Sequence, residues 1–232
     1  MPQDNADPLQ IHAAISAILP PGVHFEGGAP PAICHHLYAS ELRLVENCVP
    51  QRRREFSAGR FYARRALSRL GHRPAPILVA GGRWPVWPAG IVGSISHCAT
   101  FCGATVAVAR DVIALGFDVE EDVSLAAELI PIICSPEELE FAVSNTIWPA
   151  KRVAKLIFSI KESVFKAYHP PTASFLDFRE AMVTFDWTAQ EFVARICSPE
   201  RPPVFGRREI TGRFGAAGGV VFSIASISSG II

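Results

Sequence analysis

The sequence has no net charge, and charged residues of either sign are few. The 232 residues include 22 basic and 22 acidic side chains, and charged residues make up 19% of the chain against 49% that are apolar. A chain with this apolar content can bury enough apolar surface for one large domain or two small cores, which excludes a disordered protein. The neutral balance excludes a generally basic nucleic-acid binder, so we expect no nucleic-acid partner.

Long apolar runs and closely spaced cysteines are missing as well. No stretch is long and apolar enough to cross a bilayer, so we expect no stable membrane insertion. The N-terminal segment starts acidic and lacks the basic and apolar order of a signal peptide. Neither the Cys34-His35-His36 run nor the Cys98 and Cys102 pair has a spacing usual for zinc. We expect a cytoplasmic protein with reduced thiols, because the six cysteines are too scattered for a disulfide framework: Cys34, Cys48, Cys98, Cys102, Cys134 and Cys197.

Basic residues gather in two short segments of the chain. Nine of the eighteen arginines lie between Arg43 and Arg73, and all four lysines lie between Lys151 and Lys166. A protein that is neutral on average but basic in two places can bind a compact polyanion at one site. A bias of genome composition toward arginine explains the counts at least as well, so the counts alone leave both explanations open.

Apolar residues at helical spacing predict two long helices and a shorter one. Gly71 is placed to end the first long helix, Pro170 and Pro171 to stop the second, and Ser135 to start a further helical turn. The predicted helices cover residues 10–19, 50–70 and 148–168, with a helical or turn-rich segment at 124–143.

The remaining segments have β character and turn signals. Gly27 and Gly28 are predicted to lie in a loop. Strands and helices do not follow a regular βαβ rhythm, which favours an α+β fold, and each half has one long helix and several strands. Strands are expected within residues 32–42, 76–90, 91–110, 112–120, 181–197 and 218–228.

Two acids in the segment "GFDVE" form the first candidate site. Asp118 and Glu120 are two apart on a predicted strand, so their carboxylates lie side by side on one face. Two such charges repel each other unless a proton or a cation offsets them, and Mg²⁺ prefers oxygen ligands. An exposed acidic turn is the alternative, since Glu121 and Asp122 continue the run.

The segment "FSIKESVFKAYHP", residues 158–170, carries the second candidate site. Glu162 and Lys166 are four apart and share one face of the helix, with Lys161 on the adjacent face. A third carboxylate beside the two strand acids would complete a divalent-metal site, and the lysines could hold phosphates. Taken alone, such a segment is more often a solvated face of ion pairs.

Arginines and a polar corner supply further candidates. Arg53, Arg60 and Arg64 fall on one face of the first long helix, with Arg52 beside it, and guanidinium groups recognise phosphate in a fork geometry. A solvated helix face is again the simpler explanation. In "GSISHC", Ser96 and His97 have no acid nearby in the sequence to complete a nucleophilic triad.

Read in order, four segments resemble the successive motifs of 4′-phosphopantetheinyl transferases, most closely the enterobactin-synthase type that activates siderophore and polyketide assembly lines. The resemblance covers residues 52–178, well over half of the chain. The four segments are "RRREFSAGRFYARRAL", "WPVWPAGIVGSISHC", "GFDVE" and "FSIKESVFKAYHP".

The resemblance implies a fold and an activity. The expected fold is α+β, with two pseudo-symmetric subdomains at 1–115 and 116–232 and the active site between them. The expected reaction moves 4′-phosphopantetheine from coenzyme A to a serine of an apo acyl, peptidyl or aryl carrier protein and releases adenosine 3′,5′-bisphosphate. The expected enzyme is a monomer that depends on Mg²⁺. A non-catalytic coenzyme A or carrier-binding module and a Mg²⁺-dependent phosphohydrolase are the alternatives.

The resemblance also implies roles for individual residues. Asp118, Glu120 and Glu162 match the metal ligands, and with Lys166 they form the expected catalytic set, Glu162 being the candidate base. The serine nucleophile belongs to the partner, so no triad is needed. The expected coenzyme A contacts are Arg52 (with Arg53 as its rival), Arg60, Arg83, Ser96, His97, Lys161, Lys166 and Leu176.

Two positions depart from the family pattern. Phe117 replaces an aliphatic residue, and we expect its side chain to point into the core, away from the acids. The loop at 79–83 matches the adenine-binding region, where relatives carry a lysine and this chain has Val79 and Arg83. The carrier protein is expected to dock near the cleft and the segment 123–150.

Overall fold

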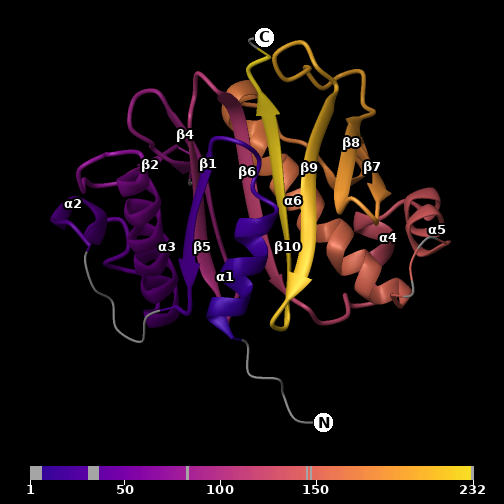
Figure 1. Cartoon of the computed structure of the whole chain (residues 1–232), viewed down its shortest axis with the longest axis horizontal. Coiled ribbons are helices and arrows are strands. Elements are labelled where there is room, and N and C mark those ends of the chain that lie inside the picture. The colour runs from indigo at the N-terminus through magenta and orange to yellow at the C-terminus, as the bar shows by residue number, and fades with distance from the viewer. Residues whose placement is uncertain (1–6, 31–36, 82–83, 145, 147, 231–232) are drawn as a thin grey trace.

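Two antiparallel sheets stand beside each other in the computed structural model, which describes residues 7–30, 37–81, 84–144, 146 and 148–230 (Figure 1). The first sheet has the order β1 (Val23–Gly28), β5 (Cys102–Val108), β4 (Ile91–His97). The second has the order β6 (Val112–Glu121), β10 (Val220–Ser228), β9 (Glu209–Ala217), β8 (Glu191–Ile196), β7 (Ala181–Asp186), and a small ladder joins β2 (Val79–Ala80) to β3 (Trp84–Pro85).

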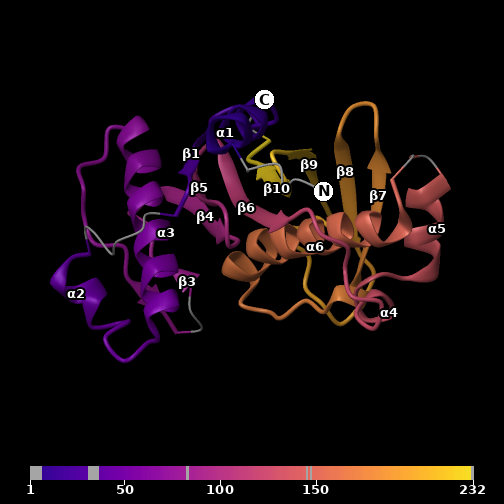
Figure 2. The same ribbon diagram turned by 90° about the horizontal axis from the view of Figure 1, so that it is seen from below.

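One long helix packs against each sheet. Helix α3 covers the three-stranded sheet, while α6 and α1 lie on opposite faces of the five-stranded sheet (Figure 2). The arrangement confirms the predicted α+β class. The helices are α1 (Pro8–Ala17), α2 (Ala39–Leu42), α3 (Pro50–Arg69), α4 (Ile130–Ile133), α5 (Pro136–Ser144), α6 (Ala150–Thr172) and the 3₁₀ turn η1 (Phe178–Glu180).

Strand β10 is buried on both faces, which explains its continuous apolar sequence. Phe222 and Ile224 join the core under α1, whereas Val221 and Ala225 face the core under α6. Phe117 on β6 is fully buried in the first of these cores, as the sequence predicted. Because α1 comes from the N-terminus yet packs on the C-terminal sheet, the two halves share a core. The division after residue 115 falls within β6 and stays a prediction.

Strand β1 corrects the loop predicted at Gly27 and Gly28. Both glycines pair with β5, and a Cβ atom on Gly27 would lie 2.5 Å from the ring of Phe25 and 2.9 Å from that of Phe101. The glycines therefore make room for aromatic rings within a strand, and they do not form a turn.

Two other boundaries differ from the predictions. The end of the strand expected at 32–42 is the short helix α2, and residues 31–36 lie outside the described residues. Helix α6 continues through Pro170 and Pro171 to Thr172: the proline ring keeps φ near the helical value, although each proline removes one N–H donor from the last turn. Ala173, with φ 49°, closes the helix through its N–H to the carbonyl of His169 at 2.8 Å. Within the described ranges, no helix combines the length and apolarity that crossing a membrane requires.

Candidate active site

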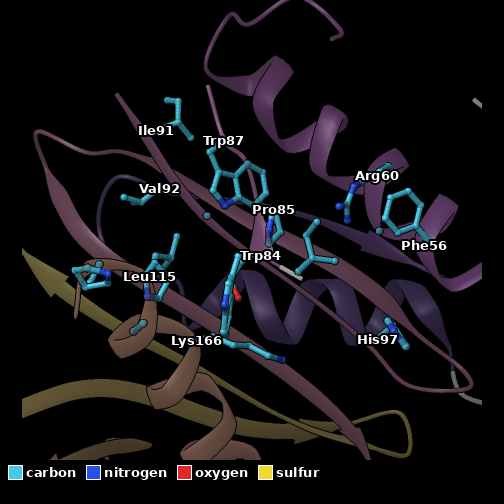
Figure 3. A pocket seen from close by; sticks show the side chains of 18 of the residues that line it. Phe56, Arg60, Trp84, Pro85, Trp87, Ile91, Val92, His97, Leu115 and Lys166 are labelled. Atoms are coloured by element: carbon cyan, nitrogen blue, oxygen red, sulfur yellow. The ribbon is translucent and has the colours of Figure 1, made fainter. Parts of the chain in front are cut away.

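A cavity of about 330 Å³ opens between the two halves of the molecule (Figure 3). Helix α3 and strand β4 form one side, and β6 and the end of α6 form the other. Trp84 and Trp87 form part of the wall; the ring of Trp84 stacks on that of His169 with centroids 4.4 Å apart. The cavity is lined by apolar groups with a few charged ones, as in sites for organic ligands.

Arg60 places a buried positive charge at this cavity. Its Nε donates to the carbonyl of Ile77 at 2.9 Å, and its guanidinium lies 4.0 Å from the centre of the Phe56 ring. Burial lowers the pKa of Arg60 to about 10, so the group is still protonated at neutral pH. A fixed cation with donors to spare suits an anionic ligand.

Arg52 and His97 meet at Glu55, a residue that the sequence analysis did not single out. The Glu55 carboxylate lies 3.6 Å from Arg52 and 3.7 Å from His97, and all three line the cavity. Burial lowers the pKa of His97, which Glu55 only partly offsets. The helical spacing of three between Arg52 and Glu55 was the signal available in the sequence.

The other arginines of α3 lie elsewhere. Arg53 donates to the backbone carbonyls of Cys48 and Glu46. Arg64 forms a buried ion pair with Glu41 at 2.8 Å. The predicted arginine face therefore contributes only Arg60 to the cavity, with Arg52 beside it, because two of its members have structural partners. Arg83 lies outside the described residues.

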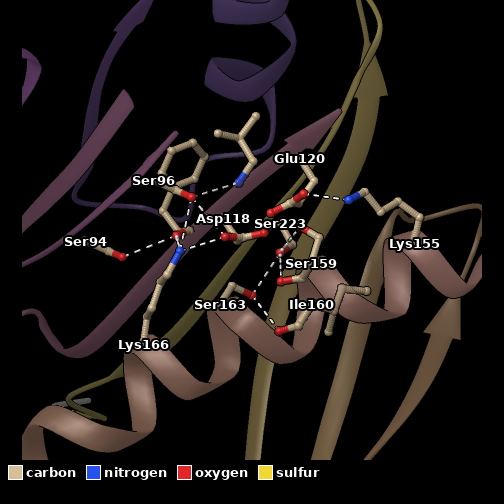
Figure 4. A network of polar contacts seen from close by, with 12 residues as sticks. Ser94, Ser96, Asp118, Glu120, Lys155, Ser159, Ile160, Ser163, Lys166 and Ser223 are labelled. Atoms are coloured by element: carbon tan, nitrogen blue, oxygen red, sulfur yellow. Dashed lines mark hydrogen bonds and ion pairs between the residues drawn. The ribbon is translucent and has the colours of Figure 1, made fainter. Parts of the chain in front are cut away.

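The polar corner of β4 joins Asp118 of β6 and Lys166 of α6 in one network (Figure 4). Asp118 Oδ1 accepts hydrogen bonds from Ser96 Oγ at 2.9 Å and from Lys166 Nζ at 2.7 Å. Lys166 also donates to the Phe117 carbonyl at 3.2 Å. Ser96 and Lys166, which are 22 and 48 residues from Asp118 in the chain, thus meet at one carboxylate.

Asp118 Oδ2 is buried and has no hydrogen-bond partner among the described residues. A buried, unpartnered carboxylate oxygen is costly, which indicates a ligand position. Glu120 pairs with Lys155 at 2.6 Å. Glu162 has neither a hydrogen bond nor an ion pair with any residue that the structure describes.

The electrostatics of the acids fit an additional cation. Burial raises the pKa of Glu120, and the charge of Asp118 adds to the rise. Burial also raises the pKa of Glu162; Lys166 opposes this, while Asp118 and Glu120 reinforce it. The described residues contain no ready-made cluster of three metal ligands. The three acids outnumber Lys155 and Lys166 by one charge, however, and with the open oxygen of Asp118 they suit an oxygen-preferring divalent ion.

Lys161 is not where the sequence analysis expected it. Its side chain is buried and does not line the main cavity; it pairs with Glu138 at 2.8 Å and donates to the carbonyls of Ile133 and Phe178 at 2.8 and 2.7 Å. This neighbour of Glu162 thus ties α6 to α4, α5 and η1. Helical periodicity could not reveal it, because the partners come from distant segments.

Leu176 is buried beside a second, smaller cavity of about 210 Å³. Lys161, Glu162, Phe165 and Phe175 also line this cavity. Phe165 contacts Trp84, which lines the main cavity, with ring centroids 5.5 Å apart. Glu162 therefore has the network of acids and an apolar cavity within reach.

Comparisons with known proteins define the class of this chain. Residues 40–107 match the 4′-phosphopantetheinyl transferase N-terminal domain, and residues 114–212 match the 4′-phosphopantetheinyl transferase superfamily. Both matches lie within the halves that carry the two sides of the main cavity, and the two-domain α+β organisation expected from the sequence is confirmed.

Individual relatives of the chain indicate the same family. The chain is 38% identical over 221 residues to 4′-phosphopantetheinyl transferase Svp of Streptomyces mobaraensis, covering 93% of this chain and 89% of the relative. It is 37% identical over 161 residues to PptT of Mycobacterium tuberculosis, covering 67% and 70%. It is 34% identical over 176 residues to enterobactin synthase component D of Escherichia coli, covering 74% and 81%. The chain therefore belongs to the 4′-phosphopantetheinyl transferase superfamily, and its activity is that of a 4′-phosphopantetheinyl transferase.

Proposed function

We propose that this enzyme transfers the phosphopantetheine group of coenzyme A to a serine hydroxyl of an apo carrier protein. The serine oxygen forms a bond to the β-phosphorus, the pyrophosphate bond breaks, and the bridging oxygen leaves with adenosine 3′,5′-bisphosphate. The observation that carries this proposal is the cavity between the halves, with cations on the α3 side and, on the other side, Lys166 of α6, which pairs with Asp118 at 2.7 Å.

The α3 side is proposed to bind the phosphorylated adenosine end of coenzyme A. Arg60 and Arg52 would hold the 3′-phosphate, because guanidinium groups stay charged and match phosphate geometry. His97 and Ser96 lie at the junction with the acidic network and are assigned to the pyrophosphate. Arg53 is assigned no phosphate contact, because it donates to the backbone of the segment before α3.

The α6 side is proposed to carry the transfer. Asp118, Glu120 and Glu162 would hold Mg²⁺, which offsets charge on the pyrophosphate when it is bound. Lys166, and not the buried Lys161, would contact the phosphate oxygens as negative charge builds on the leaving group.

Glu162 is proposed to accept the proton of the attacking serine. Its carboxylate is half-buried and unpaired with any described side chain, and it lies one helical turn from Lys166. A partly desolvated carboxylate is suited to take up a proton at the moment of attack. Leu176 and its cavity border this acid and are assigned to the pantetheine arm.

The proposal is tested by incubating the protein with coenzyme A, Mg²⁺ and a panel of apo carrier domains and weighing each carrier by mass spectrometry. A gain of one phosphopantetheine per carrier is expected. Glu162→Gln should abolish the gain while keeping the thermal stability of the parent protein, and Glu200→Gln, at an exposed position, is the matched control. Absence of the gain on every carrier would reject the proposal; release of phosphate without carrier would favour a phosphohydrolase.

The partner and setting are also proposals. The name of the enterobactin synthase relative favours carriers of siderophore assembly, with polyketide and peptide carriers as the other members of the panel. We assign the protein to the cytoplasm, supported by five unpaired thiols among the described residues. A monomer is expected, which size-exclusion chromatography with light scattering will check.

A further inference from the structure

Gly116, the first residue of "GFDVE", lies on β6 directly against the backbone of α6. A Cβ atom built there would come within 1.8 Å of the Ser163 carbonyl oxygen and 2.8 Å of the Ala167 nitrogen. Real Cβ atoms essentially never approach a heavy atom closer than 3.0 Å, so the helix would have to retreat by more than 1 Å to accept any side chain. No side-chain rotation can relieve this contact, because the obstructing atoms belong to the helix backbone.

The close approach continues on the neighbouring strand. Ser223 of β10 donates to the Ser159 carbonyl at 2.9 Å, and its hydroxyl lies 3.0 Å from that of Ser163 (Figure 4). Both α6 serines are fully buried. Small side chains thus fasten α6 to the sheet at the level of the acids, since Ser223 pairs with Asp118 in the sheet register.

The distance between β6 and α6 decides the geometry of the reactive groups. Asp118 and Glu120 follow Gly116 at alternate positions of the strand and so share its face, toward α6. Glu162 and Lys166 belong to the helix. The hydrogen bond of 2.7 Å from Lys166 Nζ to Asp118 Oδ1 connects the helix to the strand. A retreat of the helix would separate the acids of the strand from both groups.

We propose that Gly116 is a positioning residue for phosphopantetheinyl transfer, which sets the spacing between the two strand acids and the helix pair Glu162 and Lys166. This inference rests on the proposed function. A displacement of about 1 Å at a reacting centre costs on the order of 100-fold in rate. The α3 side that is assigned to the adenosine end lies across the cavity and does not depend on this contact.

The test compares Gly116→Ala with Gly212→Ala in the full chain, using the carrier assay and urea unfolding. Gly212 is a matched control: it occupies the same row of the sheet, both glycines pairing with Ala225, and its added Cβ would lie 2.2 Å from the Ile224 oxygen, away from the site. Both variants should lose stability. Per folded molecule, only Gly116→Ala should lose kcat, by about 100-fold, with little change in the KM for coenzyme A.

A graded pair of variants keeps the inference testable where Gly116→Ala yields no folded protein. Ser223→Thr adds a methyl group at the same helix–sheet contact and should lower kcat. Ser223→Ala removes the hydrogen bonds to Ser159 and Ser163 and should lower stability, but it adds no volume and should retain kcat. Unchanged kcat in both Gly116→Ala and Ser223→Thr, or an equal loss in Gly212→Ala, would overturn the inference. An inactive parent protein would instead reject the proposed function, so the two failures are distinct.

Discussion

Replacement of Lys161 by methionine tests whether this lysine stabilises the fold or contacts the substrate. Its ammonium is buried with Glu138, and both side chains are almost fully withdrawn from solvent. Breaking one partner of a buried ion pair costs about 3–5 kcal/mol, because the remaining charge is uncompensated. Glu138 would keep two backbone donors, the N–H groups of Ser135 and Val183 at 2.8 Å each, so we expect the lower end of that range.

A loss of about 3 kcal/mol is a large share of the 5–15 kcal/mol that stabilises a typical domain. For a chain of this size it corresponds to a fall in Tm of about 6–12 °C. The measurement is thermal and urea unfolding of Lys161→Met, with Lys151→Met, an exposed lysine of the same helix, as the control. The double variant Lys161→Met/Glu138→Gln should lose less than the sum of the single changes, since the two groups are coupled.

Kinetics distinguish the two roles of Lys161. The folded fraction of Lys161→Met should keep a KM for coenzyme A close to that of the parent protein. A variant that unfolds like the parent protein, yet needs tenfold more coenzyme A for half-maximal rate, would refute the assignment of Lys161 to the core and restore it to the phosphate site.

Three further predictions concern titration and packing. Burial would raise the pKa of Glu26, but hydrogen bonds from Arg69 and Arg65 outweigh burial, so the net pKa is lowered. The stability that the Glu26 carboxylate contributes is therefore present above about pH 4.5 and is lost as pH falls further. Glu26→Gln should reduce this loss of stability at acidic pH, measured by unfolding between pH 3 and 7. Burial raises the pKa of Cys134 to about 12, so mass spectrometry after iodoacetamide treatment at pH 8 should find the exposed Cys197 alkylated well before Cys134; equal rates would contradict the buried position. Removing Mg²⁺ with a chelator should abolish transfer while leaving Tm nearly unchanged, because the core lies elsewhere; a large fall in Tm would show that the ion is structural.

The sequence by itself determined the class of the protein and the chemistry of its site. Helical spacing located α3 to within a residue or two, because apolar side chains repeat on its buried face. Alternation on β6 placed Asp118 and Glu120 on one face, and the order of four motifs identified the family. The helix and the strand depend on residues close together in the chain, where backbone geometry alone fixes which side chains share a face.

Only the tertiary structure decided which charged groups serve the site and which serve the fold. Arg60 and Arg64 share a helix face, yet Arg64 forms an ion pair with Glu41 while Arg60 lines the cavity. Lys161 and Lys166 flank the same acid, yet Lys161 pairs with Glu138 of α5 and Lys166 with Asp118 of β6. The strand at Gly27 was not predicted because its glycines leave space for aromatic rings, most of which come from distant positions in the chain. In each case the deciding partner is far away in the sequence, where no local pattern records it.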